Sequence, residues 1–261
     1  MRVAALTFHD VVAEPEEARP GEPFYRITAA QLEELLSALH KLGYQTVSSR
    51  EFRRWQRGEV QLPEKTVVFT FDDGYASHCE VVAPLLRRHG FSGTFFLTTE
   101  FIGRPGYVTW EQARRLVFLG MEIGSHGSTH RPLISLSREA LDEELTRSKR
   151  ALEEKLGIPV LAIAAPGGFW NQAVADAVQR AGFEAAWVST IGTNGPETQP
   201  LALRRVSVHQ PFSSPTLIAM VEGRRVAVFW AQNQQFLLRA LKRVLGVYGY
   251  ERLKRLLMPN A

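Results

Sequence analysis

The chain has 261 residues, of which 45% are hydrophobic and 22% are charged, with one cysteine. These values are typical of a globular protein with one large or two small domains, and a lone cysteine excludes an internal disulfide framework. The net charge is +4, but from Val221 onward eight Lys or Arg face two Glu, which leaves residues 1–220 at −2. The basic character therefore belongs to the C-terminal end, and we expect no nucleic-acid partner.

The N-terminus passes from Met1 and Arg2 directly into a strand-like apolar run that ends at His9. This run is too short for a signal peptide, and no apolar run in the chain is long enough to span a bilayer. We therefore expect a cytoplasmic protein, with membrane-peripheral attachment as an alternative, unless a leader precedes the given sequence.

Strand-like and helix-like segments alternate over the first 210 residues or so. Predicted strands cover residues 2–8, 45–48, 66–71, 92–97, 122–125, 160–164, 185–189 and 203–208. Predicted helices cover residues 29–42, 51–58, 76–89, 110–119, 138–156 and 172–181, three of them after capping patterns at Thr28, Thr109 and Ser137. This alternation predicts a parallel sheet. We expect an α/β fold, namely a distorted, incomplete (β/α)7-type barrel with added C-terminal helices.

The chain divides into two predicted parts. Residues 1–215 form the barrel, and residues 216–261 form a basic helical extension in which Leu237, Leu241 and Val244 recur at helical spacing. Two interpretations of the extension stay open. Its helices either pack over the end of the barrel or attach, through residues 232–261, to an anionic membrane surface.

Polar residues collect just after predicted strands, where active sites of β/α barrels lie. The most informative are Asp72 and Asp73, which follow the strand at residues 66–71 and precede a glycine turn. Two carboxylates in a confined site raise each other's pKa, and a metal ion would relieve that cost by taking one as a ligand and leaving the other as a base. The alternative is a turn with two solvated acids.

His126 and His130 follow the predicted strand at residues 122–125. On a helical turn their spacing would place both imidazoles on one side, where they could share a metal ion. Gly, Ser and Thr lie between them, so no apolar helix face is present to bury them as core histidines. Two imidazoles and one carboxylate with open positions predict a hydrolytic metal site, most naturally for zinc.

Residues 70–74 (TFDDG) and 125–130 (SHGSTH) resemble the first two signatures of the NodB-homology polysaccharide deacetylases, carbohydrate esterase family four. Residues 8–11, 42–48 and 62–65 resemble the subgroup that includes poly-N-acetylglucosamine deacetylases. The resemblance covers roughly residues 1–210. It implies metal-dependent hydrolysis of N-acetyl groups from an N-acetylated sugar polymer or oligosaccharide.

By position, the resemblance assigns Asp73, His126 and His130 as ligands of a divalent metal ion, most naturally Zn²⁺, with Ni²⁺ or Co²⁺ as alternatives. Asp72 would be the general base that deprotonates the attacking water. The segment at residues 164–168 (AAPGG) stands at the third motif, so the Gly167 N–H is the candidate donor to the oxyanion. An ordinary loop is the alternative for that segment.

The chain also departs from the family pattern. The third motif often contains an arginine that orients the basic aspartate, and Ala164 stands at that position. Arg204 and Arg205 are candidates to replace it, unless the base is less constrained; we also count Arg205 among the candidate substrate-binding residues.

Three further residues are weaker candidates. Trp187 is what remains of the fourth motif; it would stack on a sugar ring, or else be a core aromatic residue. His209 is the candidate acid that protonates the leaving amine, or else a histidine of a surface loop. His9 is a candidate substrate contact, with a structural hydrogen bond as the equal alternative.

The expected partner is thus an N-acetylated glycan, with peripheral membrane contact through the basic C-terminal helices as a further hypothesis. Two rival functions stay open because the third and fourth motifs are altered. One is hydrolysis of another non-peptide C–N bond in a small molecule on the same fold. The other is a non-catalytic carbohydrate-binding relative, against which the four intact acid and imidazole residues speak.

Overall fold

The computed structural model describes residues 1–13, 23–209 and 212–224. One sheet has the strand order β10–β1–β5–β6–β7–β8–β9–β11, and all of its pairs except β10–β1 are parallel. The parallel strands are β1 (Val3–Phe8), β5 (Thr66–Phe71), β6 (Thr94–Leu97), β7 (Glu122–Ser125), β8 (Ala162–Ala164), β9 (Ala185–Val188) and β11 (Leu203–Arg204). The expected α/β architecture is confirmed.

The shorter strands complete this arrangement. The strand β10 (Thr193–Asn194) pairs antiparallel with β1, and β4 (Gln45–Thr46) pairs with β5. A separate pair is formed by β2 (Val11–Val12) and β3 (Ile27–Thr28).

The strand expected at residues 203–208 is interrupted at Arg205. Its first half, β11, pairs with β9, whereas its second half, β12 (Val206–Ser207), pairs with β1. At the interruption the Arg205 N–H donates to the Thr190 carbonyl at 3.0 Å. The expectation of one continuous strand is wrong because this segment pairs first with β9 and then with β1. In doing so it links the last strand to the first and nearly closes the barrel.

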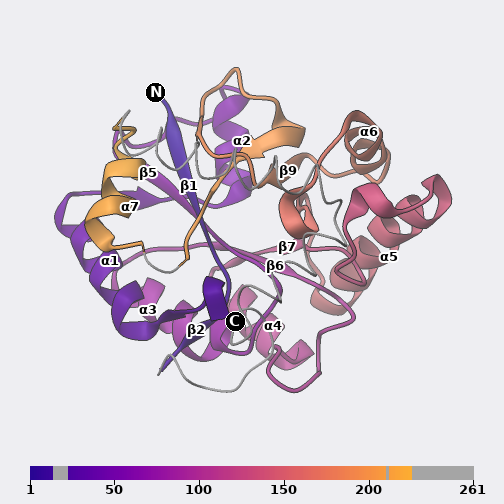
Figure 1. Ribbon diagram of the computed structural model, residues 1–261, viewed down its shortest axis with the longest axis horizontal. Coiled ribbons are helices and arrows are strands. Elements are labelled where there is room, and N and C mark those ends of the chain that lie inside the picture. The colour runs from indigo at the N-terminus through magenta and orange to yellow at the C-terminus, as the bar shows by residue number, and fades with distance from the viewer. Residues whose placement is uncertain (14–22, 210–211, 225–261) are drawn as a thin grey trace.

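Helices surround the sheet, with α1, α3 and α7 on one side and α5 and α6 on the other (Figure 1). Their bounds are α1 (Ala29–Lys41), α2 (Ser49–Gln56), α3 (Ala83–Arg88), α4 (Trp110–Phe118), α5 (Arg138–Leu156), α6 (Gln172–Arg180) and α7 (Ser214–Val221). The expected capping boxes at Thr28 and Thr109 are present. A third capping box at Ser48 starts α2 two residues before the expected position. The helix expected at residues 76–89 is instead a π-helical turn, η2 (His78–Val82), followed by α3.

Two apolar cores follow from the alternation of side chains along the strands. The larger lies between the sheet and the helices, and the smaller fills the inside of the barrel. The inner core consists largely of alanine and valine around two large rings, Phe96 and Trp187. Phe52 of α2 joins it, and the Ser49 N–H at the start of α2 donates to Thr94, the first residue of β6. Helix α2 therefore covers the end of the barrel where β6 begins, opposite the ends of the strands that carry the candidate site residues.

The boundary expected between residues 215 and 216 falls inside α7, which packs against α1 and β1. The described beginning of the extension is thus part of the barrel's outer layer. Residues 225–261, on which the membrane hypothesis depends, lie outside the described residues. Within the described residues, no helix combines the length and the apolar character needed to cross a bilayer.

Candidate active site

The two acids after β5 point to different partners although they are neighbours in sequence. The Asp72 N–H donates to the Phe8 carbonyl at 2.9 Å and so prolongs the pairing of β5 with β1. At Asp73 the backbone turns, with φ of 77°, and Gly74 follows with φ of 88°. Side chains of both acids are buried, with 3% of Asp72 and 7% of Asp73 exposed. The turn therefore sends two carboxylates into the interior rather than into solvent.

The carboxylate of Asp73 lies close to the two predicted imidazoles. Asp73 Oδ1 lies 3.2 Å from His126 Nε2 and 3.0 Å from His130 Nε2. One donor atom of each residue lies within 4.8 Å of the others, a spacing that allows one ion to bind all three. Tertiary structure thus brings together the three residues predicted as metal ligands, from the ends of β5 and β7, between which β6 lies in the sheet.

The backbone at this group is strained. Within residues 1–13, 23–209 and 212–224, the non-glycine residues in the left-handed region are Asp73, with φ of 77°, and His130, with φ of 64°. Such conformations cost roughly 1–3 kcal/mol each and tend to cluster at functional sites. The segment between the histidines is a loop, so the expectation of a helical turn is wrong there. The positive φ angle, rather than helical spacing, brings His130 back to Asp73.

The donor atoms fit a divalent cation. His126 Nδ1 lies 2.9 Å from the Ala164 carbonyl, which only accepts hydrogen bonds, so Nδ1 carries the proton. When this ring is neutral, Nε2 carries a lone pair that faces the Asp73 carboxylate and repels it. The buried Oδ1 of Asp73 has no hydrogen-bond partner of good geometry among the described residues. A cation between these atoms would remove the repulsion. One carboxylate and two imidazoles, one of them oriented by a carbonyl, form a typical zinc-binding set.

Protonation in this group follows from burial and proximity. Burial acts to raise the pKa of Asp73, but His126 and His130, where they donate a proton to it, outweigh burial and hold that pKa well below its usual range. Burial acts to lower the pKa of His130, but the neighbouring Asp73 outweighs it and the pKa is raised. Asp73 is therefore an anionic ligand at neutral pH.

The carboxylate of Asp72 contacts a guanidinium group. Arg205 Nη1 donates to Asp72 Oδ1 at 2.8 Å and lies 3.3 Å from Thr70 Oγ1. Burial acts to raise the pKa of Asp72, but the charge of Arg205 outweighs it, and the pKa is lowered. Arg205 thus replaces the missing third-motif arginine as the partner of Asp72, whereas Arg204 is exposed.

Arg205 does not have the position of a substrate contact. Only 2% of it is exposed, and its guanidinium lies over the ring of Phe96 in the inner core. Its expected role as a substrate-binding residue is therefore corrected to one of contacting Asp72.

Trp187 requires a second correction. Its side chain is fully buried in the inner core, and its indole N–H donates to Ser49 Oγ on α2 at 2.7 Å. The ring is directed toward the end of the barrel that α2 covers, so it offers no face to a sugar. The alternative interpretation, a core aromatic residue, describes what the structure shows.

His9, at the end of β1, lies close to both acids. Burial lowers its pKa, while the charges of Asp73 and Asp72 act in the opposite direction. Its Nδ1 is buried and has no hydrogen-bond partner among the described residues. A neutral imidazole with an unpartnered nitrogen therefore lies beside the two carboxylates, a position compatible with the expected substrate contact.

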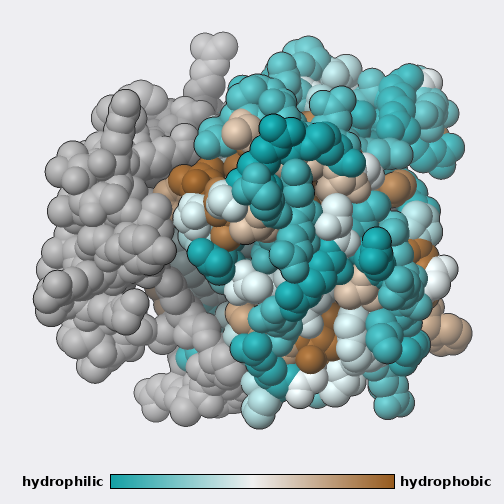
Figure 2. All heavy atoms as spheres, turned by 90° about the vertical axis from the view of Figure 1, so that its right-hand side faces the viewer, coloured by the Kyte–Doolittle hydropathy of each residue, from teal (hydrophilic) through white to brown (hydrophobic). Residues whose placement is uncertain are grey.

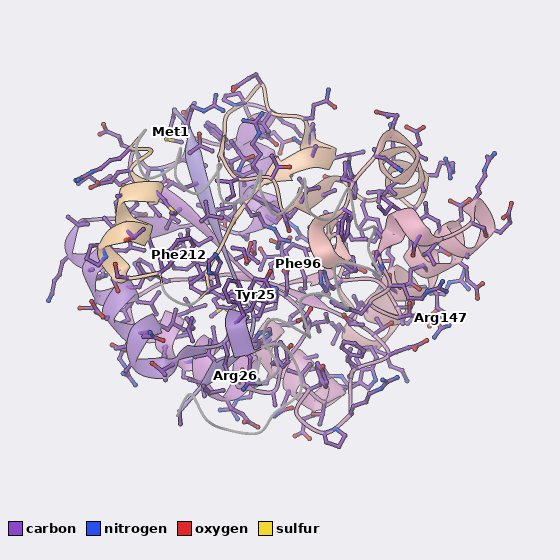
Figure 3. The ribbon with its side chains drawn as sticks, viewed as in Figure 1. Met1, Tyr25, Arg26, Phe96, Arg147 and Phe212 are labelled. Carbon is purple, nitrogen blue, oxygen red and sulfur yellow. The ribbon has the colours of Figure 1, made fainter. Side chains whose placement is uncertain are left out.

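His209 lies in a different environment. Its ring is stacked on Phe24 and tilted against Phe212, both at centroid distances of 4.3 Å. The ring centroid of Tyr25 lies 6.2 Å from that of His209 and 4.7 Å from that of His9, so Tyr25 lies between the two imidazoles. Tyr25 lies near the middle of the view in Figure 3, with Phe212 to its left. The structure thus places His209 in an aromatic cluster beside His9, and its role as the acid stays a prediction.

Gly167 lies on the same rim as the metal ligands. It belongs to a short turn, η4 (Pro166–Gly168), that follows β8 three residues after Ala164, whose carbonyl contacts His126. The residue is exposed and has φ of 66°, which an L side chain rarely adopts. Its role as the oxyanion donor stays a prediction.

Two residues of the site were not anticipated from the sequence. His78, which was given no role, donates from Nε2 to the His9 carbonyl at 2.9 Å and so holds the end of β1. Tyr75 is stacked on Tyr107 with ring centroids 5.2 Å apart. Burial and the charge of Asp73 raise the pKa of Tyr75, so its hydroxyl keeps its proton. Their position immediately after the acidic turn was the available signal.

Comparisons with known proteins agree with this site. The family model for polysaccharide deacetylases matches residues 59–186. YxkH of Bacillus subtilis, a candidate polysaccharide deacetylase, is 26% identical over 77% of this chain and 72% of its own length. The poly-beta-1,6-N-acetyl-D-glucosamine N-deacetylase of Escherichia coli is 32% identical over 47% of this chain and 20% of its own length.

A solved structure is similar over most of the barrel. IcaB from Ammonifex degensii superimposes with a TM-score of 0.73 and 26% identity, covering 88% of this chain and 97% of IcaB. The matched family region contains Asp72, Asp73, His126 and His130. Residues 59–186 therefore form a polysaccharide deacetylase domain, of the NodB-homology group of carbohydrate esterase family four that the two motifs resemble.

Proposed function

We propose that this protein is a metal-dependent deacetylase that hydrolyses N-acetyl groups of an N-acetylated sugar polymer or oligosaccharide. One observation carries the proposal. Asp73, His126 and His130 share a common centre, while the adjacent Asp72 is kept out of that group by Arg205. A site for binding alone needs no second ionised carboxylate beside the ligands, whereas hydrolysis needs a base there.

The chain's own residues divide the work of the reaction. Asp73, His126 and His130 would hold a divalent ion, which would supply Lewis acidity toward the acetamide carbonyl and lower the pKa of water. Asp72, ionised because Arg205 lowers its pKa, takes a proton from the water that attacks the carbonyl carbon. The Gly167 N–H stabilises the negative charge on the carbonyl oxygen. The C–N bond then breaks and acetate leaves, while the sugar amine takes up a proton from His209, the proposed acid.

Two imidazoles are assigned to the amide group of the substrate. The charges of both acids and of His126 act on the pKa of His9, so His9 lies beside the reacting centre. The ring of His209 packs against Phe24 and Phe212. We propose that His9 contacts the amide group and that His209 is the acid that protonates the leaving amine.

The substrate class is proposed from the relatives. The Escherichia coli protein is named for poly-beta-1,6-N-acetyl-D-glucosamine, and 47% of this chain is similar to it. We propose an N-acetylated glucosamine glycan as the substrate and zinc as the metal ion, with nickel and cobalt as alternatives. The membrane contact proposed for residues 232–261 is a separate hypothesis, which liposome binding with and without these residues would decide.

Acetate release tests the proposal. The purified protein, freed of metal by a chelator and reloaded separately with Zn²⁺, Ni²⁺ or Co²⁺, is incubated with a panel of N- and O-acetylated glycans. We expect acetate from N-acetylated glycans after metal reloading. Asp72→Asn should retain the metal ion and lose about 10²- to 10⁴-fold in kcat, the range typical of a lost general base.

Other outcomes would support the rival functions. Full activity of Asp72→Asn would refute the role of Asp72. Hydrolysis of a cyclic or other small amide, with no acetate from any glycan, would favour another C–N bond as the substrate. Glycan binding without turnover of any compound would favour a non-catalytic relative.

A further inference from the structure

Helix α5 sends a buried carboxylate into the loop between the two metal-binding histidines. Glu144 is 6% exposed, and its Oε1 accepts the N–H groups of Ser128 and Thr129, each at 2.7 Å. The Thr129 hydroxyl lies 3.1 Å from both carboxylate oxygens. One side chain therefore binds two consecutive backbone amides and one hydroxyl of a loop that begins at His126 and ends at His130.

The course of this loop depends on the contact with Glu144. Gly127 has φ of 79°, and a Cβ atom there would lie 2.7 Å from Glu144 Oε1. His130 at the other end has φ of 64°, a conformation that persists only where surrounding contacts hold it. Glu144 supplies contacts that can hold this conformation. Hydrogen bonds to a carboxylate are stronger than those to a neutral acceptor.

A second side chain of the same helix holds the start of the loop. The Gly127 N–H donates to Ser125 Oγ, which lies 2.8 Å from Ser148 Oγ, and Ser148 donates to the Leu145 carbonyl. Ser148 follows Glu144 by four residues and so lies on the same face of α5. This face packs on β7, whereas the side of the molecule that carries α5 and α6 is largely hydrophilic toward solvent (Figure 2).

We propose that Glu144 is a positioning residue that sets the affinity of the site for its divalent ion, by fixing the 127–129 loop so that both imidazoles face Asp73. The inference rests on the proposed metal site and goes beyond the residues that would touch the ion. It assigns to α5 a role that neither motif contains. The carboxylate acts through the backbone, and it does not contact the ion or the substrate.

Zinc binding measured without turnover tests the proposal. The affinity of the metal-free full-length protein for Zn²⁺ is measured by competition with a chelating indicator, for the wild type, Glu144→Ala and Glu144→Gln. We expect Glu144→Ala to weaken binding about 10- to 100-fold, the range typical of residues that orient metal ligands. Glu144→Gln should lose less, because its amide oxygen still accepts both N–H groups. Acetate release by Glu144→Ala should recover in excess zinc.

Two control variants separate positioning from folding. Glu143→Ala removes an exposed carboxylate one residue away on the same helix and should leave zinc affinity unchanged. Leu145→Ala opens the buried core behind the loop, and it should lower Tm without a comparable loss of zinc affinity. If Glu144→Ala does not fold, Glu144→Gln carries the comparison, with a several-fold weaker affinity expected.

Wild-type zinc affinity in both Glu144 variants would overturn the proposal. So would a loss in Leu145→Ala as large as that in Glu144→Ala at an equal Tm, because the effect would then be one of general stability. Failure of the proposed function is a different result. In that case the wild type binds zinc and releases no acetate, while the ranking of the variants in zinc affinity still stands.

Discussion

The two neighbouring carboxylates of the site are supported by opposite kinds of structure. Asp73 meets two imidazoles that come from one short segment, residues 126–130, held in a strained loop. Asp72 meets one guanidinium that comes from a position 133 residues away, at an interruption between two strands. The metal side therefore depends on local backbone geometry, and the base side depends on closure of the barrel.

Because of this difference, removing a partner of Asp73 and removing the partner of Asp72 should have different consequences. Removal of an imidazole takes away a donor atom but leaves the barrel's pairing intact. Removal of Arg205 leaves a buried carboxylate without its partner inside the barrel, which affects protonation and stability together. The variants below test this separation, in order from the largest expected effect on activity to the smallest.

His126→Ala should have the largest effect because it removes one of three donor atoms. We expect zinc affinity to fall by more than about 100-fold, since loss of an orienting partner alone costs 10- to 100-fold. Acetate release should fall with it at limiting zinc, while Tm of the metal-free protein changes little. His40→Ala, an exposed histidine on α1 that lies 3.1 Å from the His89 carbonyl, is the matched control. Equal zinc affinity of the two variants would remove His126 from the site.

Arg205→Met should shift the pH dependence of activity. Without the guanidinium, burial dominates and the pKa of Asp72 rises. The acidic limb of the kcat/KM profile should move to higher pH. Arg205→Lys should restore part of the shift, and Arg204→Met, on the exposed neighbour, should show none. A profile of Arg205→Met that coincides with the wild type would contradict the pairing.

The same variant should reverse a dependence of stability on pH. In the wild type the pKa of Asp72 is lowered on folding, so its ionised form stabilises the protein above the ordinary pKa of an aspartate, and this is lost as pH falls through the lowered value. In Arg205→Met the pKa is raised on folding, so the stabilisation is present at low pH and lost as pH rises. The free energy of unfolding should drop by about 3–5 kcal/mol at neutral pH and by less in acid.

Trp187→Phe should have the smallest effect on catalysis. The indole donates to Ser49 Oγ inside the barrel, so the variant should lose about 0.5–1.5 kcal/mol of stability from that hydrogen bond. KM for the glycan should stay unchanged, because no part of the ring reaches solvent. Steady-state kinetics beside thermal unfolding would show this. A raised KM at an unchanged Tm would restore the sugar-stacking interpretation that the structure overturned.

Several elements could be predicted to the residue. The strands at Thr66–Phe71 and Glu122–Ser125 and the helix at Arg138–Leu156 were expected with the bounds they have. Each has a clear local signal, such as a β-branched run, or Ser137 and Gly157 at the two ends of the helix. The acid and imidazole motifs directly follow such strands, so the metal group could be predicted with them.

The failures have a common physical cause. Trp187 and Arg205 have side chains that suit either a sugar contact or a core position, and composition cannot distinguish these. The interruption at Arg205 reflects competition between β9 and β1 for one segment, which arises only when the barrel closes. The roles of His78 and Glu144 depend on contacts with His9 and the 127–129 loop, across elements that no short motif spans.

The sequence by itself determined the order of strands and helices, the two acids after β5 and the two imidazoles after β7. These depend on side-chain periodicity and on turn residues within a few positions of each other, which can be read without any long-range contact. Only the tertiary structure decided which arginine pairs with Asp72 and which helix holds the histidine loop. These contacts join residues that are distant in the chain, and they form only when the barrel and its helices pack together.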